Sequence, residues 1–188
     1  NYGFFFTQPD LLDVKSKAWL RHYFEEHIYP VVTPLAVDSG HPFPFLTNHT
    51  INAIVRIFQI LPNGTKDYKI AILPIPSVLD RIIEIPSRSN KEHRFVYLED
   101  VITYYANQFF QGYGIEDYMV FRITRDADLE IDEEEATDLL SEVEESLRRR
   151  RRGDAVRLEV CGDVKDHLLD FVLTSVELEQ KDVYRIDG

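Results

Sequence analysis

Residues 29–56 read YPVVTPLAVDSGHPFPFLTNHTINAIVR, and this stretch decides the fold because it carries four of the nine prolines. Each proline fixes its own φ angle and pushes the preceding residue into extended geometry, which excludes helix from about Pro30 to Phe45. Asp38-Ser39-Gly40 in the middle predicts a tight turn. The stretch is also apolar, at Val31, Val32, Leu35, Val37, Phe43, Phe45 and Leu46. A rigid, apolar segment that cannot join a sheet interior is expected to lie buried against elements that have already formed.

The segments on either side predict a helix before this stretch and a hairpin after it. In residues 15–28 the apolar side chains recur on one face, as in an amphipathic helix, at Trp19, Leu20, Tyr23, Phe24 and Ile28. Pro30 ends that helix. Residues 51–61 are almost continuously apolar and predict a strand. A turn at Pro62-Asn63-Gly64 joins it to an antiparallel partner over residues 68–73.

The rest of the chain mixes short strands and helices. Strands are predicted at residues 82–85, 95–96, 118–124, 155–160 and 183–186. Helices are predicted at residues 98–110, with Gly112 as a stop, at 133–152 and at 164–173. The 133–152 helix has a stripe at Ala136, Leu139, Leu140, Val143 and Leu147 that is expected to be buried. The sequence therefore predicts an α+β fold, a single domain whose mixed, largely antiparallel sheet packs with amphipathic helices.

Composition narrows the class of protein. The 188 residues suit one domain with a substantial core, and the single cysteine, Cys161, excludes an internal disulfide and fits a reducing compartment. No segment approaches the roughly 20 apolar residues that a membrane span needs. A net charge of −12 repels polyanions such as nucleic acid. The start of the chain lacks the basic region of a signal peptide, and we expect it to reflect a cut from a longer chain.

The sequence lacks a complete motif for catalysis or metal binding. A nucleophilic histidine needs a base and a cationic cradle, and no such arrangement adjoins the six histidines, at His22, His27, His41, His49, His93 and His167. The acids of residues 126–132 resemble a calcium loop, but Ile131 stands where glycine is needed and Thr137 where glutamate is needed. We therefore predict no catalytic, cofactor-binding or metal-binding residue in this chain.

Two groups of residues are candidates for an interface. Phe43 and Phe45 are two apart in an extended segment, so their rings should project together, either into the core, which we favour, or as an anchor for another domain or subunit. His41 beside them is expected to hydrogen-bond to the loop backbone. In the basic run of residues 148–152, two arginines pair with glutamates one helical turn earlier. This leaves Arg150, Arg151 and Arg152 for an inter-domain contact.

The proline-rich stretch also carries a family resemblance. Thr33-Pro34-Leu35-Ala36-Val37-Asp38 and Gly40-His41-Pro42-Phe43-Pro44-Phe45 resemble the signature of the head, or middle, domain of the first family of polyphosphate kinases. FVYLEDVI at residues 95–102 and the stretch from 121 to 160 agree with it. The chain departs from the family at Asn48-His49-Thr50 and at Tyr97, which marks a divergent member. The resemblance implies that residues 1–14 lead in from a preceding domain and that residues 15–188 form the head domain.

The resemblance further implies what the parent enzyme does. Members of this family reversibly transfer the terminal phosphate of ATP to inorganic polyphosphate through a phosphohistidine, with magnesium. The nucleophile, ATP and polyphosphate are expected to be bound outside this chain, which by itself would be inactive and need no cofactor. The expected partners are other domains of the same kinase and, in the full enzyme, a second subunit. The expected location is the cytoplasm, with membrane association of the full enzyme left open. The alternative is a free-standing interaction or dimerisation module that keeps the fold without kinase activity.

Overall fold

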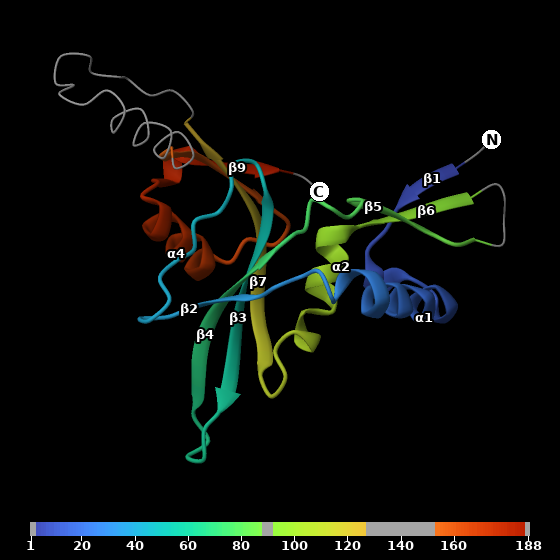
Figure 1. Cartoon of the computed structure of the whole chain (residues 1–188), viewed down its shortest axis with the longest axis horizontal. Helices are drawn as coiled ribbons and strands as arrows, with labels where there is room; N and C mark the ends of the chain where they lie inside the picture. The colour runs from blue at the N-terminus through green and yellow to red at the C-terminus, as the bar shows by residue number, and fades with distance from the viewer. Residues whose placement is uncertain (1–2, 88–91, 127–152, 187–188) are drawn as a thin grey trace, which may run out of the picture.

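The computed structural model describes residues 3–87, 92–126 and 153–186 (Figure 1). Its helices are α1 (Val14–Tyr23), α2 (Leu98–Tyr104) and α4 (Asp166–Val176), and its shorter helical turns are η1 (Pro9–Leu11), η2 (Phe24–Ile28), η3 (Ala106–Gln108) and η4 (Gln180–Asp182). Its strands are β1 (Gly3–Phe6), β2 (Leu35–Val37), β3 (Ile51–Ile60), β4 (Lys66–Pro74), β5 (Ile82–Ile85), β6 (Glu92–Tyr97), β7 (Gly114–Arg125), β8 (Ala155–Cys161) and β9 (Val183–Ile186).

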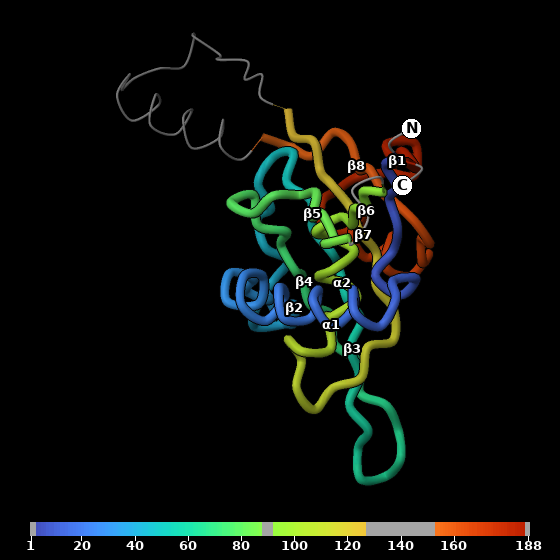
Figure 2. Tube along the Cα trace, turned by 90° about the vertical axis from the view of Figure 1, so that its right-hand side faces the viewer, coloured from blue at the N-terminus to red at the C-terminus, as the bar shows by residue number. Residues whose placement is uncertain are grey.

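The described strands form two sheets. The large sheet has the order β2-β4-β3-β7-β8-β9, and the small sheet has the order β1-β6-β5. All neighbours pair antiparallel except β1 with β6 and β8 with β9, which run parallel. The predicted α+β class with a mixed, largely antiparallel sheet is confirmed. The hairpin loop between β3 and β4 projects at the end of the molecule away from the small sheet (Figures 1 and 2).

Helices cover the large sheet on both faces, so the molecule has two cores (Figure 1). The central strand β3 serves both of them, because successive side chains of a strand point to opposite faces. Ala53 and Val55 pack toward α1, α2 and the small sheet, and Ile54 between them packs toward α4. All three are fully buried, which explains why the sequence of this strand is apolar without alternation.

The predicted helix before the proline-rich stretch is confirmed over α1 and η2. Asp13 caps α1 by accepting hydrogen bonds from the N–H groups of Lys15 and Ser16 at 3.0 and 3.1 Å. The last turn widens to π geometry, and Tyr29 N–H donates to the carbonyl of Phe24. The stripe of this helix enters the core at Leu20, Phe24 and Ile28, which are fully buried.

The proline-rich stretch joins the large sheet only at its edge. Residues 35–37 form β2, which pairs with β4, and the predicted turn follows, closed by two backbone hydrogen bonds between Asp38 and His41. Val32 and Leu46 are buried as expected. Val31 and Phe45 are exposed, so the expectation that the whole segment is buried is wrong for these two side chains.

Two other predictions differ from the structure. The helix predicted for residues 98–110 ends at Tyr104, because Tyr105 leaves helical geometry at φ −100° and ψ 16°, and η3 then brings Phe110 into the core. Residues 3–6, for which we predicted no element, form β1. The predicted helix of residues 133–152 lies outside the described residues. The other predicted strands, the hairpin and the helix near residues 164–173 are confirmed.

The two aromatic residues of β7 allow a matched test of the core assignment. Phe121 is almost completely buried toward α4, whereas Tyr118 on the same strand is 47% exposed. We expect Phe121→Ala to lower the free energy of unfolding by about 3–5 kcal/mol and Tyr118→Ala by less than about 1 kcal/mol. Urea unfolding of both variants measures this difference, and equal midpoints would contradict the assignment.

Candidate functional site

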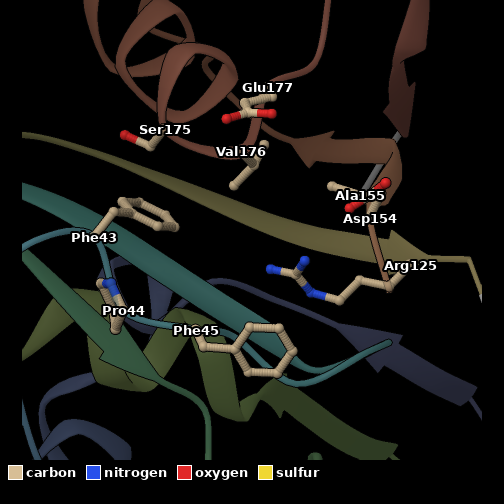
Figure 3. Close-up of a pocket in the computed structure, with 9 residues that line it drawn as sticks. All are labelled: Phe43, Pro44, Phe45, Arg125, Asp154, Ala155, Ser175, Val176 and Glu177. Atoms are coloured by element: carbon tan, nitrogen blue, oxygen red, sulfur yellow. The ribbon is translucent and has the colours of Figure 1, made fainter. Parts of the chain in front are cut away.

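A pocket of about 400 Å³ lies where the proline-rich stretch meets the ends of β7, β8 and α4 (Figure 3). Its described lining residues come from segments far apart in the chain: Phe43, Pro44, Phe45, Arg125, Asp154, Ala155, Ser175, Val176 and Glu177. The pocket thus contains the aromatic pair that the sequence singles out, together with polar residues that it does not.

The two rings enter the pocket from the same side of the extended segment (Figure 3). Phe43 is half-buried, packs against the core below α4, and has its ring centroid 6.2 Å from that of Phe171. Phe45 is 48% exposed, and the Arg125 guanidinium lies 4.2 Å from its ring centroid, which is cation–π geometry. The favoured expectation of core packing therefore fits Phe43 in part and is wrong for Phe45.

Arg125 is held in place by main-chain groups of two segments. Its Nε donates to the carbonyl of Leu46 at 3.0 Å and its Nη1 to the carbonyl of Gly153 at 3.0 Å. The side chain of Asn48 also holds the main chain of Arg125, since its Oδ1 accepts from the backbone N–H of Arg125 at 2.9 Å. Burial lowers the pKa of the Arg125 guanidinium, and the nearby carboxylate of Asp154 opposes this effect. The arginine therefore clamps the proline-rich stretch to the junction of β7 and β8.

Gly153 lets this junction close. A Cβ built on Gly153 would lie 1.6 Å from the carbonyl oxygen of Asp126, the residue after β7. Any side chain at position 153 would therefore collide with the backbone there. Asp126 N–H donates to the carbonyl of Asp154 at 2.9 Å across the same junction. The position of the Asp154 carboxylate at the pocket thus depends on a glycine at 153.

The end of α4 contributes the second acid. Glu177 follows the helix in the left-handed conformation, at φ 58°, which a residue with a Cβ adopts only at an energetic cost. Its N–H donates to the carbonyl of Leu173 and closes the helix. Figure 3 shows its side chain on the α4 side of the pocket, beside Ser175 and Val176. A glycine would relieve the strain there but would remove this charge.

The side chains that line the pocket are suited to binding a ligand or a partner's side chain. Two ring faces, one guanidinium and two carboxylates can hold a side chain that has both an apolar body and a polar end. The hydroxyl of Ser175 already donates to the carbonyl of Phe171 at 2.7 Å, and the described lining residues include no histidine, cysteine or lysine. The pocket therefore fits the predicted interface better than a catalytic centre.

The other predicted interface residues do not join this pocket among the described residues. His41 is exposed, and it bonds to the loop backbone through its main chain, because its N–H and carbonyl pair with the carbonyl and N–H of Asp38. Its ring does not, since Nδ1 lies 3.1 Å from Oδ1 of Asp38. Asp38 also accepts from the N–H groups of Gly40 and His41, which places its carboxylate against the ring. The Gly40 N–H bond is the largest cause of the lowered pKa of Asp38. Arg150, Arg151 and Arg152 lie outside the described residues.

Other described histidines pair with carboxylates on the surface. Their nitrogens approach acids at 3.2 Å, 2.6 Å and 3.5 Å in the pairs His22–Glu26, His93–Glu84 and His167–Asp117. In the described part of the chain, no three His, Cys, Asp or Glu side chains lie close enough together to hold a metal ion. No described helix is long and apolar enough to cross a membrane.

Two neighbouring acids at the start of α2, the buried Glu99 and the half-buried Asp100, were not predicted from the sequence to be special. Glu99 is buried, and its Oε1 accepts from Nε of Arg81 at 2.8 Å. Its Oε2 is buried without a hydrogen-bond partner among the described residues. Burial, and next the charge of Glu99, raise the pKa of Asp100 to about 6. Burial and these two acids also raise the pKa of the Cys161 thiol.

Comparisons of the sequence and of the structure both match this chain to polyphosphate kinases. A family model described as the polyphosphate kinase middle domain matches residues 15–188. The polyphosphate kinase of Halalkalibacterium halodurans is 40% identical over 190 residues, which cover 100% of this chain and 26% of that protein. That of Pseudomonas syringae pv. tomato is 39% identical over 175 residues, covering 93% and 24%.

A solved structure supports the same fold. The polyphosphate kinase from Porphyromonas gingivalis superposes with a TM-score of 0.75 at 22% identity, over 98% of this chain and 25% of that one. At this identity the likeness concerns the fold alone. The chain spans about a quarter of the length of the curated relatives that it matches.

The two rings of the pocket are expected to respond differently to truncation. Phe43→Ala should lower the free energy of unfolding by about 1–3 kcal/mol, because its ring is half-buried in the α4 core. Phe45→Ala should cost less than about 1 kcal/mol, the size of an exposed cation–π contact. Denaturant unfolding measures both values, and a Phe45 variant that is the less stable of the two would contradict this account of the pocket.

Asp100 is expected to make stability depend on pH. Its folded pKa of about 6 lies above the ordinary value of 3.8, so the folded state binds more protons between these values. Its contribution is therefore fully present below about pH 4 and is lost as the pH rises through 6. After solvent screening we expect the loss to be about 1–2 kcal/mol.

Asp100→Asn tests this pH dependence. The variant should lose less stability than the parent between pH 4 and pH 7, with the difference equal to the contribution of Asp100. Asp10→Asn, at an exposed acid, is the matched control and should follow the parent. Parallel pH profiles for all three proteins would show that Asp100 does not titrate in this window.

Proposed function

The chain belongs to the polyphosphate kinase family, and from this we propose that it is the middle domain of an enzyme that reversibly transfers the terminal phosphate of ATP to inorganic polyphosphate. The observation that carries the proposal is the match of the middle-domain model to residues 15–188. The identity of about 40% to a polyphosphate kinase over the whole chain supports it. The activity is proposed for the full-length protein, because the matched relatives are about four times longer than this chain.

Within that enzyme we assign this domain an assembly role and place the chemistry elsewhere. Phosphoryl transfer from ATP needs a magnesium site and cations around the phosphates. The net charge of −12 opposes polyphosphate binding on this domain as a whole. The phosphohistidine, ATP and Mg²⁺ of the family are therefore assigned to the rest of the protein.

The pocket lined by Phe43 and Phe45 is our candidate for a contact with another part of the enzyme or with a second subunit. Its arginine and exposed ring have the composition of interface anchors. His41 and the run Arg150, Arg151 and Arg152 remain candidates for the same role. Residues 15–188 are proposed as the domain itself and residues 1–14 as its lead-in. A location in the cytoplasm fits the single free cysteine.

The proposal is tested by comparing the 188-residue chain with the full-length protein. With ATP, Mg²⁺ and a polyphosphate primer, the full-length protein should extend the primer and form an acid-labile phosphohistidine. The 188-residue chain should do neither.

The outcomes separate the alternatives. Primer extension by the 188-residue chain would contradict the assignment of the chemistry to other domains. A full-length protein that neither extends the primer nor becomes phosphorylated on histidine would instead favour an interaction module that keeps the fold without the kinase activity.

A further inference from the structure

The outer face of the small sheet is an exposed aromatic surface. The aromatic side chains on it come from β1 and β6, which are paired in parallel register, with Phe4 opposite His93 and Phe6 opposite Phe95. The rings stack along the pair: Phe4 lies 5.3 Å from His93, and Phe6 lies 4.8 Å from Tyr97, between ring centroids. Ile82 of β5 extends the same face and is half exposed. We call this surface the aromatic face.

Its exposure is unusual for a folded domain. Phe4 and Phe6 are 68% and 53% exposed, although both are large apolar side chains on one short strand. The inner face of the small sheet is by contrast covered at β5 and β6, where Ile83, Ile85 and Val96 are buried in the core below α1 and α2, although Phe5 on the same face of β1 is 53% exposed. Contiguous apolar surface that crosses several strands marks an interaction site more often than chance exposure does.

The edge of the same sheet is also open. In the described structure β1 is an outer strand, paired only with β6, so one side of its backbone has no partner strand. Exposed edge strands pair readily with other chains, and natural proteins normally protect them with charge, proline or a covering element. Gly3-Phe4-Phe5-Phe6 carries none of these protective residues.

We propose that, in the full-length protein, the polypeptide region preceding the middle domain docks on the aromatic face and the β1 edge. β1 precedes residue 15, where the middle-domain match begins, and the relative from Halalkalibacterium halodurans aligns over the whole chain, β1 included. A strand from ahead of the domain therefore completes the domain's small sheet. The region joined to that strand is held beside the aromatic face by the chain itself.

Two physical arguments favour this occupant over a second copy of the chain. A tethered region experiences an effective concentration in the millimolar range, well above that of a free partner. Two copies that each carry a charge of −12 repel one another, and the aromatic face offers little to offset this repulsion. Its polar side chains include the close pair His93–Glu84 and Arg81, which lies 5.2 Å from the ring of Tyr97.

This surface is distinct from the pocket of Phe43 and Phe45. The small sheet packs with α1 and α2, whereas the pocket lies beside α4 on the other side of the large sheet (Figure 1). The inference goes beyond the proposed function, because it holds whether or not the full-length protein is an active kinase.

Hydroxyl-radical footprinting of the side chains tests the proposal. We expect Phe4 and Phe6 to be oxidised about fivefold or more slowly in the full-length protein than in the 188-residue chain, because an interface core excludes water. Tyr68 and Tyr104, which are exposed away from the aromatic face, are internal references for the radical dose. Equal oxidation of Phe4 and Phe6 in the two proteins would overturn the proposal.

Matched variants identify the face and the occupant. In the parent, Tyr97 should also be oxidised more slowly in the full-length protein than in the 188-residue chain. Phe4→Ser combined with Phe6→Ser, made in both proteins, should abolish this difference, whereas Phe5→Ser, on the opposite face of β1, should leave it. Loss of protection in both variants would overturn the assignment to the aromatic face. Protection that appears in the 188-residue chain itself and grows with protein concentration would identify a second copy as the occupant and overturn the tethered one.

Discussion

The burial of β3 on both faces is the constraint on which the rest of the structure depends. The side chains on the two faces of this strand pack in different cores, so the large sheet needs a helical layer on each face. α1 and α2 supply one layer and α4 the other. The extended, proline-rich stretch runs from the first layer to the second. Near its start, Val32 packs in the core of α1 and α2, and near its end, Leu46 packs in the core of α4. The pocket forms where that crossing ends against α4.

Much of this arrangement is contained in the sequence because it depends on local rules. Proline spacing predicts where helix is impossible, and the mostly apolar residues 51–61 predict a strand, whose burial on both faces only the structure shows. The turn at Asp38 and the end of the first helix follow from the same kind of information. The stretch that resembles the family signature also contains Phe43 and Phe45, which line the pocket.

The polar half of the pocket is not predictable in this way. Arg125 and Gly153 are 28 residues apart in the chain, and the antiparallel register of β7 and β8 brings them together. Glu177 stands at a position where a helix end favours glycine, and a sequence pattern alone gives no sign of its left-handed backbone. The buried Glu99 likewise looks like an ordinary first-turn acid. For Arg125, Gly153 and Glu99 the missing information is a contact between residues far apart in the chain, and Phe45 was wrongly assigned to the core for the same reason.

The parallel pairing of β1 with β6 affects the order in which the protein folds during synthesis. Phe4 can pair with His93 only after α1, the hairpin of β3 and β4, and β5 have left the ribosome, since all of them lie between the two strands. Such distant pairings form late, because closing a long loop costs entropy before any contact repays it. The three consecutive phenylalanines of β1 therefore lack β6 while most of the domain is synthesised, so we expect a ribosome-associated chaperone or the region that precedes the domain to cover them during this time.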